Sequence, residues 1–339
     1  MNVFSTGVLT GVVNSLQVSP QFLLDKFFPT VQTESSEEIH FDMENDVMGL
    51  APFVLPVVEG QLIAERGYVT KTFKPAYIKP KHAFEPQKAL KRAIGEPLLG
   101  TFSPEDRARR LVAQDLSVQR TIIERRLEWM ASQVIRTGSV TISGDKYPTS
   151  VVSFGRDAAL TVTVTGTAQW DDVAANPLGN LESWANLVYQ KSGSWPTDVI
   201  MDKDAWSYFR ANSSVISIID RQRDVGMMPS LNENAPLYNG GRLAGTVIGF
   251  NIWVYVGYYK DDVGVMTPYL PSGTVLMLGD LMGVRAFGAI QDEEAGIQAV
   301  PMFSKSWLVP DPGRRFIMTQ SAPLVVPYRV NASLCATVL

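Results

Sequence analysis

The feature that most constrains this chain is one long amphipathic helix. Residues 103–106 read SPED, which provides a serine N-cap, a proline at the first helical position and acidic residues in the first turn, with Asp106 placed for a capping-box contact. Gly138 then supplies the residue type that commonly ends a helix. The pattern predicts a helix over residues 103–136. Such a helix is about 50 Å long at about 1.5 Å per residue, against an ordinary mean of about 11 to 12 residues.

Two apolar stripes run along this helix. A second stripe lies about a quarter-turn from the first, so we expect the helix to contact two surfaces. Taken alone, the feature also suits the long core helix of any α/β protein. The first stripe consists of Val112, Leu116, Ile123, Leu127, Met130 and Val134, and the second of Leu111, Val118, Ile122 and Trp129.

The rest of the chain alternates strand and helix patterns. SPQFLLDKFFPT predicts a short helix closed by Pro29, and EEIHFDM alternates like a strand. SVTISGDKYP predicts a hairpin after the long helix, and capped helices follow over residues 176–193 and from Asp202. The last forty residues read as strands that must pair with earlier ones. The fold class is therefore α+β, with a helix-containing segment inserted between the long helix and its sheet.

An extended, basic segment, FKPAYIKPKHAFEP, is interrupted by Pro75, Pro80 and Pro86. Proline cannot donate to a sheet ladder, so these residues suppress indiscriminate edge pairing. We expect residues 59–90 to form a long hairpin, and residues 1–58 to form an arm too fragmented to own a core. Since an isolated hairpin is marginal in water, both segments are expected to be buried against other copies of the chain.

Charge and chemistry point away from several classes of function. The net charge of −4 and the pI near 5.4 give no overall attraction to nucleic acid. A single cysteine, Cys335, excludes an intrachain disulfide. His40 and His82 lack the setting of metal ligands or of a triad base. No secretory signal and no apolar run of roughly 20 residues occurs, so we expect no membrane span.

Three patches resemble a known family. FKPAYIKPKHAFEPQKALKR (residues 73–92) closely resembles the hairpin segment of the lambda-type major capsid proteins of tailed double-stranded DNA phages. GAIQDEE (residues 288–294) is similar to the G-x-I-Q-D segment of that family, and DPGRRFIMTQSAPL, within residues 307–324, resembles its C-terminal pattern. Together with SPQFLLDKFF, these patches occur in matching order across nearly the whole chain.

The resemblance implies the Hong Kong 97-like capsid fold. Its parts map here as an N-terminal arm (1–58), an extended loop (59–90), a peripheral domain that begins with the spine helix (91–174), an axial domain (175–285), and C-terminal strands that return to the peripheral sheet (286–339). The implied function is that of a major capsid (head) protein that self-assembles into the icosahedral shell enclosing phage DNA. Such a protein is part of the virion, is assembled in the host cytoplasm, and is no enzyme; we expect no cofactor and no metal.

The implied partners are hexamers and pentamers of the same chain, a portal, decoration and scaffolding proteins, and packaged DNA held without sequence-specific contact. We expect apolar contacts with the adjacent subunit, charge pairs between arginines and acids of an arm, and lysines that meet acidic surfaces. The residues proposed for these three roles are, in turn, Phe73, Tyr77 and Ile78; Arg92, Arg107, Arg109 and Arg110 with Glu37 and Glu38; and Lys74, Lys79 and Lys81.

Two alternatives remain open from the sequence. One is a trimeric phage tail or adhesin module, which would form small defined oligomers. The other is a hydrolase that uses an acid pair such as Asp261 and Asp262 with a metal ion, although adjacent acids in turns are usually solvated.

Overall fold

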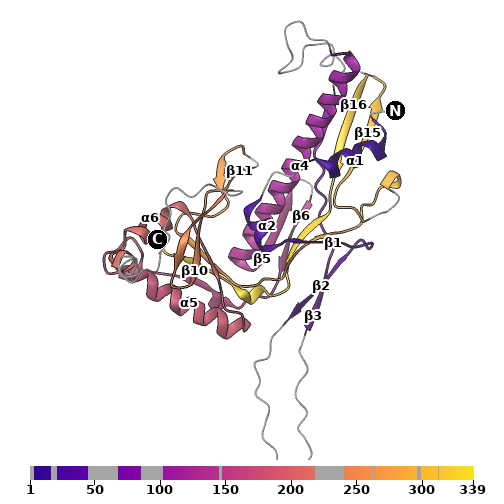
Figure 1. The fold of residues 1–339 in the computed structure, drawn as a ribbon. Helices are drawn as coiled ribbons and strands as arrows, with labels where there is room; N and C mark the ends of the chain where they lie inside the picture. The colour runs from indigo at the N-terminus through magenta and orange to yellow at the C-terminus, as the bar shows by residue number, and fades with distance from the viewer. Residues whose placement is uncertain are drawn as a thin grey trace, which may run out of the picture.

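The computed structural model describes residues 4–16, 21–44, 68–84, 102–144, 147–217, 240–261, 263–295, 299–311 and 313–339. Figure 1 shows the long helix α4 beside β15 and β16 at one end of the molecule, and β10, α5 and α6 at the other. The helices are α1 (Thr6–Ser15), α2 (Phe22–Phe27), α4 (Pro104–Thr137), α5 (Pro177–Ser192) and α6 (Lys203–Ala211), with 3-10 turns η1 (Ala158–Leu160), η2 (Gly166–Ala168), η3 (Glu293–Ala295) and η4 (Val330–Ala332).

Helix α4 forms where the sequence predicts it. The Ser103 hydroxyl accepts a hydrogen bond from the Asp106 amide at 3.1 Å, and Gly138 ends the helix in the left-handed region at φ 67°. The whole first stripe is buried. In the second stripe Val118 and Ile122 each remain 42% exposed. The second surface that the stripe predicts is therefore only partly supplied by the chain itself.

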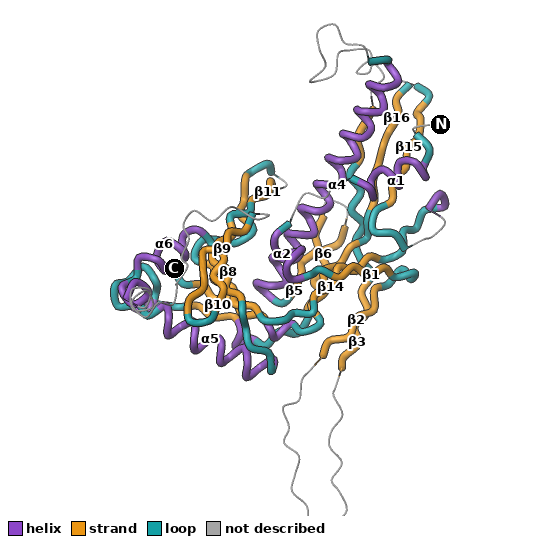
Figure 2. Tube along the Cα trace, viewed as in Figure 1, coloured by secondary structure: helices purple, strands orange, loops and turns teal. Residues whose placement is uncertain are grey.

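A six-stranded sheet forms the body that carries α5 and α6. Its central strands β8, β13 and β18 are buried along almost their whole length, as strands covered on both faces should be. Helix α5 packs near β18, and α6 packs on β8 and β10 (Figure 2). In spatial order the strands are β7 (Thr161–Thr163), β18 (Ser333–Thr337), β13 (Thr274–Leu278), β8 (Asp198–Met201), β10 (Phe250–Tyr255) and β9 (Gly241–Val247).

Smaller sheets lie around α4. Strands β15 (Phe303–Val309), β16 (Arg314–Gln320) and β4 (Lys81–Phe84) form one, and β1 (Thr30–Thr33), β14 (Gly283–Phe287) and β17 (Pro323–Pro327) form another. Both sheets contact α4 through β4, β16 and β17. The two-stranded pairs are β2 (Ile39–Glu44) with β3 (Tyr68–Phe73), β5 (Ser139–Gly144) with β6 (Tyr147–Ser153), and β11 (Tyr258–Lys260) with β12 (Met266–Pro268).

The last strand does not lie where the resemblance implies. Strand β18 sits between β13 and β7 in the six-stranded sheet, next to strands from residues 175–285. The expectation that the C-terminal strands return to the peripheral sheet is therefore wrong for Ser333–Thr337. The reason is physical: SLCAT carries only small or apolar side chains, of which all but the last residue are buried, and it suits the interior of a sheet.

The predicted hairpin within residues 59–90 is also wrong in its pairing. Strand β3 pairs antiparallel with β2, from Ile39 opposite Phe73 to Glu44 opposite Tyr68, whereas β4 pairs with β16. Pro75 and Pro80 separate β3 from β4, and neither can donate to a ladder. The part of the predicted loop over residues 59–67 and 85–90 lies outside the described residues.

The described part of the predicted arm packs on its own subunit. Leu9 and Val13 of α1, and Phe22, Leu23 and Leu24 of α2, belong to the same core as the buried face of α4. This corrects the expectation that the arm lacks a place in the core of its own chain. Residues 4–16 and 21–44 need no neighbouring copy to bury their apolar side chains.

Candidate functional site

Three segments that are far apart in sequence meet beside β16. The Tyr77 hydroxyl donates a hydrogen bond to the Ala289 carbonyl oxygen at 2.9 Å and accepts one from the Gln291 amide at 3.1 Å. Ile78 and Ser321 exchange backbone hydrogen bonds of 2.9 and 3.1 Å. These contacts join the segments whose sequences resemble the capsid family, so the motif residues hold one another within a single subunit.

Asp292 extends this junction into β15 and β16. Its carboxylate accepts hydrogen bonds from the Lys305 Nζ at 2.5 Å and from the Gln320 side-chain amide at 3.1 Å. Burial alone would raise the pKa of Asp292, but these hydrogen bonds outweigh burial and hold the pKa below its ordinary value. The carboxylate therefore stays ionised and ties η3 to both strands.

The three side chains predicted to make apolar contacts with a neighbour are used inside the chain. Phe73 and Ile78 are partly buried against the core, and Tyr77 has both hydrogen bonds described above. The structure thus gives each of them a role in the fold of its own subunit. A contact with an adjacent subunit stays a prediction for all three.

The predicted lysines also contact their own chain. Lys74 forms an ion pair with Glu37. The Lys79 Nζ lies 4.6 Å from the centre of the Tyr77 ring, and that of Lys81 lies 4.9 Å from the Phe316 ring, both within range of a cation–π interaction. All three lysines are exposed, so they remain accessible to a partner.

The arginine cluster lies on the first turns of α4. Arg109 and Arg110 are exposed, Arg107 is partly buried, and Arg92 lies outside the described residues. The Arg110 guanidinium stacks 3.8 Å from the Phe102 ring. Glu38 is exposed on the loop before β2, whereas Glu37 already pairs with Lys74. Pairing between this cluster and the two glutamates of another copy stays a prediction.

The β11–β12 hairpin presents apolar side chains to solvent. Val263 is 87% exposed, and Val265 and Met266 are 59% and 58% exposed. The Asp261 carboxylate accepts hydrogen bonds from the amides of Val263 and Val265, at 3.0 and 2.8 Å, and so fixes the turn. Asp261 is thus engaged in a turn, and Asp262, the other member of the predicted acid pair, lies outside the described residues.

A groove of about 420 Å³ lies between this hairpin and α4. Ile122 and Trp129 give it an apolar floor, and Arg125 and Arg126 give it positive charge. Ile122 belongs to the stripe of α4 that the chain leaves partly exposed. The groove and the hairpin together form an apolar and basic surface suited to contact with another protein chain.

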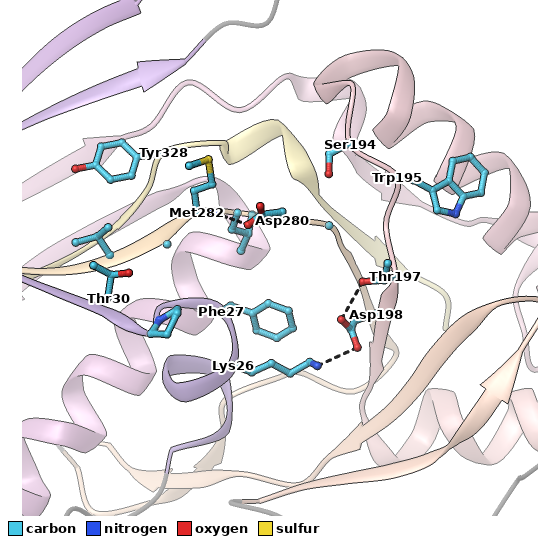
Figure 3. A pocket seen from close by; sticks show the side chains of 15 residues that line it. Lys26, Phe27, Thr30, Ser194, Trp195, Thr197, Asp198, Asp280, Met282 and Tyr328 are labelled. Atoms are coloured by element: carbon cyan, nitrogen blue, oxygen red, sulfur yellow. Dashed lines mark hydrogen bonds and ion pairs between the residues drawn. The ribbon is translucent and has the colours of Figure 1, made fainter.

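A second cleft, of about 570 Å³, lies between α2 and the six-stranded sheet. Figure 3 shows Lys26 reaching from α2 to Asp198, and Met282 and Tyr328 lining the other side. The Lys26 Nζ lies 3.1 Å from the Asp198 Oδ1. Met282 is half exposed and has a positive φ of 46°, which is uncommon for a residue with a side chain.

Neither a metal centre nor a membrane span is found in the part of the chain that the structure describes. No group of three His, Cys, Asp or Glu side chains there is arranged to hold a metal ion, and no helix there is long and apolar enough to cross a membrane.

Sequence reasoning missed four charged residues that anchor separate elements: Arg120, Glu128, Arg156 and Arg285. Arg120 Nη1 donates to the Leu16 carbonyl oxygen at the end of α1, at 2.8 Å. Glu128 is fully buried, and burial raises the pKa of its carboxyl despite three hydrogen bonds. Ala131 and Ile135, on the following turns of the same face, are apolar and could have signalled that Glu128 points inward.

Solved structures define the class of fold. A capsid protein from a prophage of Escherichia coli CFT073 superposes with a TM-score of 0.75 at 21% identity, covering 98% of this chain and 99% of that chain. A chain of the mature capsid of bacteriophage PhiM1 has a TM-score of 0.50 at 11% identity, covering 95% of this chain and 88% of that chain. The fold is that of Hong Kong 97-like phage capsid proteins.

Sequence comparison gives the family. The profile of the family described as phage major capsid protein E matches residues 5–338. The chain is 29% identical to a prophage-derived major head protein of Escherichia coli CFT073 and 28% identical to the major capsid protein of Escherichia phage lambda, in each case over 96% of both chains. This chain belongs to the phage major capsid protein E family. The predicted fold class and the predicted class of function are confirmed.

Proposed function

We propose that the chain assembles with copies of itself into the icosahedral shell that encloses the double-stranded DNA of a tailed phage. The observation that carries this proposal is the match of the family profile to residues 5–338, which spans almost the whole chain. The exposed apolar hairpin β11–β12 and the exposed stripe of α4 support it, because such surfaces mark contacts between chains.

The proposed assembly consists of hexamers and pentamers of this chain, with a portal and, in some heads, scaffolding and decoration proteins. The chain becomes part of the virion after assembly in the host cytoplasm and acts as a structural protein rather than an enzyme. Its net charge of −4 suits this role. Because each phosphate contact adds salt-sensitive affinity, a shell that gripped DNA everywhere would oppose filling and release.

The proposed charge pairs between copies provide the test. Arg109 at the start of α4 and Glu38 before β2 are both exposed, so exchanging their charges should leave the subunit folded. We expect Arg109→Glu to yield soluble subunits that form few shells, and Arg109→Glu combined with Glu38→Lys to restore them. Lys203→Glu, an exposed change on α6, serves as the charge-matched control.

Electron microscopy and sedimentation would read the result. Assembly of the unmodified chain should also weaken as ionic strength rises, because exposed charges are screened. Normal shells from Arg109→Glu, or a double variant no better than the single one, would reject this pairing. Discrete trimers in place of shells would instead favour a tail or adhesin module.

A further inference from the structure

Helix α2 occupies a position that its own six residues do not explain. A helix this short is unstable alone in water, because nucleation costs more than so few hydrogen bonds return. Its first amides are bound by α4: the Glu128 carboxylate accepts hydrogen bonds from the Leu23 amide at 2.9 Å and the Leu24 amide at 3.0 Å. The same carboxylate accepts a hydrogen bond from the Tyr255 hydroxyl of β10 at 2.8 Å.

The other end of α2 is held by the sheet that contains β14. Arg285 donates hydrogen bonds to the carbonyl oxygens of Phe28 and Leu24, at 2.6 and 3.1 Å. Its guanidinium also forms an ion pair of 2.9 Å with Asp25. Both ends of α2 are therefore satisfied by side chains from other elements, as buried backbone groups require.

A third anchor comes from the six-stranded sheet. Lys26 forms its ion pair with Asp198 at the start of β8, and its Nζ also lies 4.6 Å from the centre of the Trp253 ring. Asp198 is 9% exposed and accepts a second hydrogen bond from the Trp253 indole at 2.8 Å. Phe22 stacks 5.5 Å from the Tyr255 ring on the same sheet.

Glycines stand where both sheets meet α2. A Cβ added at Gly241 of β9 would overlap the Phe22 ring, and one added at Gly283 of β14 would overlap the Phe27 carbonyl oxygen. Each sheet thus approaches α2 through bare backbone. The cleft of about 570 Å³ lies beside this contact and is lined by the chain segment that links β13 to β14.

We infer that α2 is a wedge that sets the angle between the six-stranded sheet and the layer built on α4 and β14, with Glu128 as its positioning residue. The wedge is anchored to three elements that are otherwise joined by short connections, one of which carries the half-exposed Met282 with positive φ. An arm segment therefore fixes the shape of its own subunit. This inference does not depend on whether the chain forms shells.

Pulsed electron paramagnetic resonance on the full chain would test the wedge. Spin labels at Gln114→Cys on α4 and Gln190→Cys on α5 lie on exposed positions of the two layers, while the native Cys335 is buried. Labelled chains diluted into unlabelled chains report distances within one subunit, assembled or not. We expect one narrow distance distribution in the parent chain, and a broadened or shifted one in Glu128→Gln and in Lys26→Met.

Lys26→Met keeps the apolar stem and removes only the charge, so it should fold even if Glu128→Gln does not. Leu116→Ala, which opens a core cavity in α4 without touching α2, should destabilise the chain but leave the distance unchanged. In Glu128→Gln, hydrogen exchange at the Leu23 and Leu24 amides should quicken about tenfold for the loss of one hydrogen bond. An unchanged distance in Lys26→Met, or the same shift in Leu116→Ala, would overturn the inference.

Discussion

The Tyr77 hydroxyl donates a hydrogen bond to the Ala289 carbonyl oxygen across 2.9 Å and 212 positions of sequence. The same hydroxyl accepts the Gln291 amide, so one phenol joins two segments that share the capsid-family motifs. We expect Tyr77→Phe to lower the free energy of unfolding by about 1 kcal/mol, the usual net worth of such a hydrogen bond. Urea denaturation of the unassembled chain would measure it. Tyr208→Phe, at an exposed tyrosine, is the matched control, and equal stability of Tyr77→Phe and the parent would refute the assignment.

Arg156 holds the end of α4. Its Nη1 donates to the Ile135 carbonyl oxygen at 2.7 Å, and its Nη2 donates to the Arg136 carbonyl oxygen at 2.5 Å. Because Arg156→Ala leaves both oxygens without this donor, we expect it to cost roughly 1.5 to 3 kcal/mol of unfolding free energy. Arg156→Lys should recover only part of that, since an ammonium lacks the planar fork. Denaturation midpoints of the two variants that match the parent would contradict this role.

Two glycines should respond to alanine with opposite signs. Gly11 in α1 has open space where a Cβ would go and no positive φ, so Gly11→Ala should stabilise the chain by about 0.5 to 1 kcal/mol. Gly241→Ala should destabilise it, because the new methyl group would overlap the Phe22 ring of α2. Thermal unfolding of both variants checks the pair. The same sign in both would show that the packing around α1 or α2 is misdescribed.

Asp292 gives a predicted pH dependence. Its pKa is lower in the folded chain than in the unfolded chain, so the folded state releases this proton more readily. The stabilisation is therefore present above the unfolded pKa of about 3.9 and is lost as pH falls through the lower folded pKa. We expect the stability difference between the parent and Asp292→Asn to shrink between neutral pH and pH about 3. A difference that stays constant over this range would show that Asp292 does not act through its charge.

Local elements could be predicted from the sequence because their signals are local. The serine cap, proline and acidic first turn at one end and Gly138 at the other fixed α4 to within a residue. Asp202 likewise predicted the start of α6, where its carboxylate accepts two amides. Caps and glycines act within one helical turn, so they can be read without knowing the rest of the fold.

Pairings between distant segments could not be predicted. Strand β3 could pair with any extended neighbour, and its partner β2 is chosen by tertiary packing rather than by a turn. The same holds for β18, which joins β13 and β7 from the far end of the chain. The resemblance supplied the fold class and function, but the anchoring roles of Glu128 and Arg285 depend on contacts that no local pattern contains.

The central claim is that copies of this chain build a closed shell. Sedimentation of the purified full chain, with electron microscopy of the fast fraction, tests it most directly, with and without the other head proteins of a phage co-expressed. The account predicts closed icosahedral particles that sediment far faster than a 37.3 kDa chain. Only monomers or small defined oligomers under both conditions would contradict it.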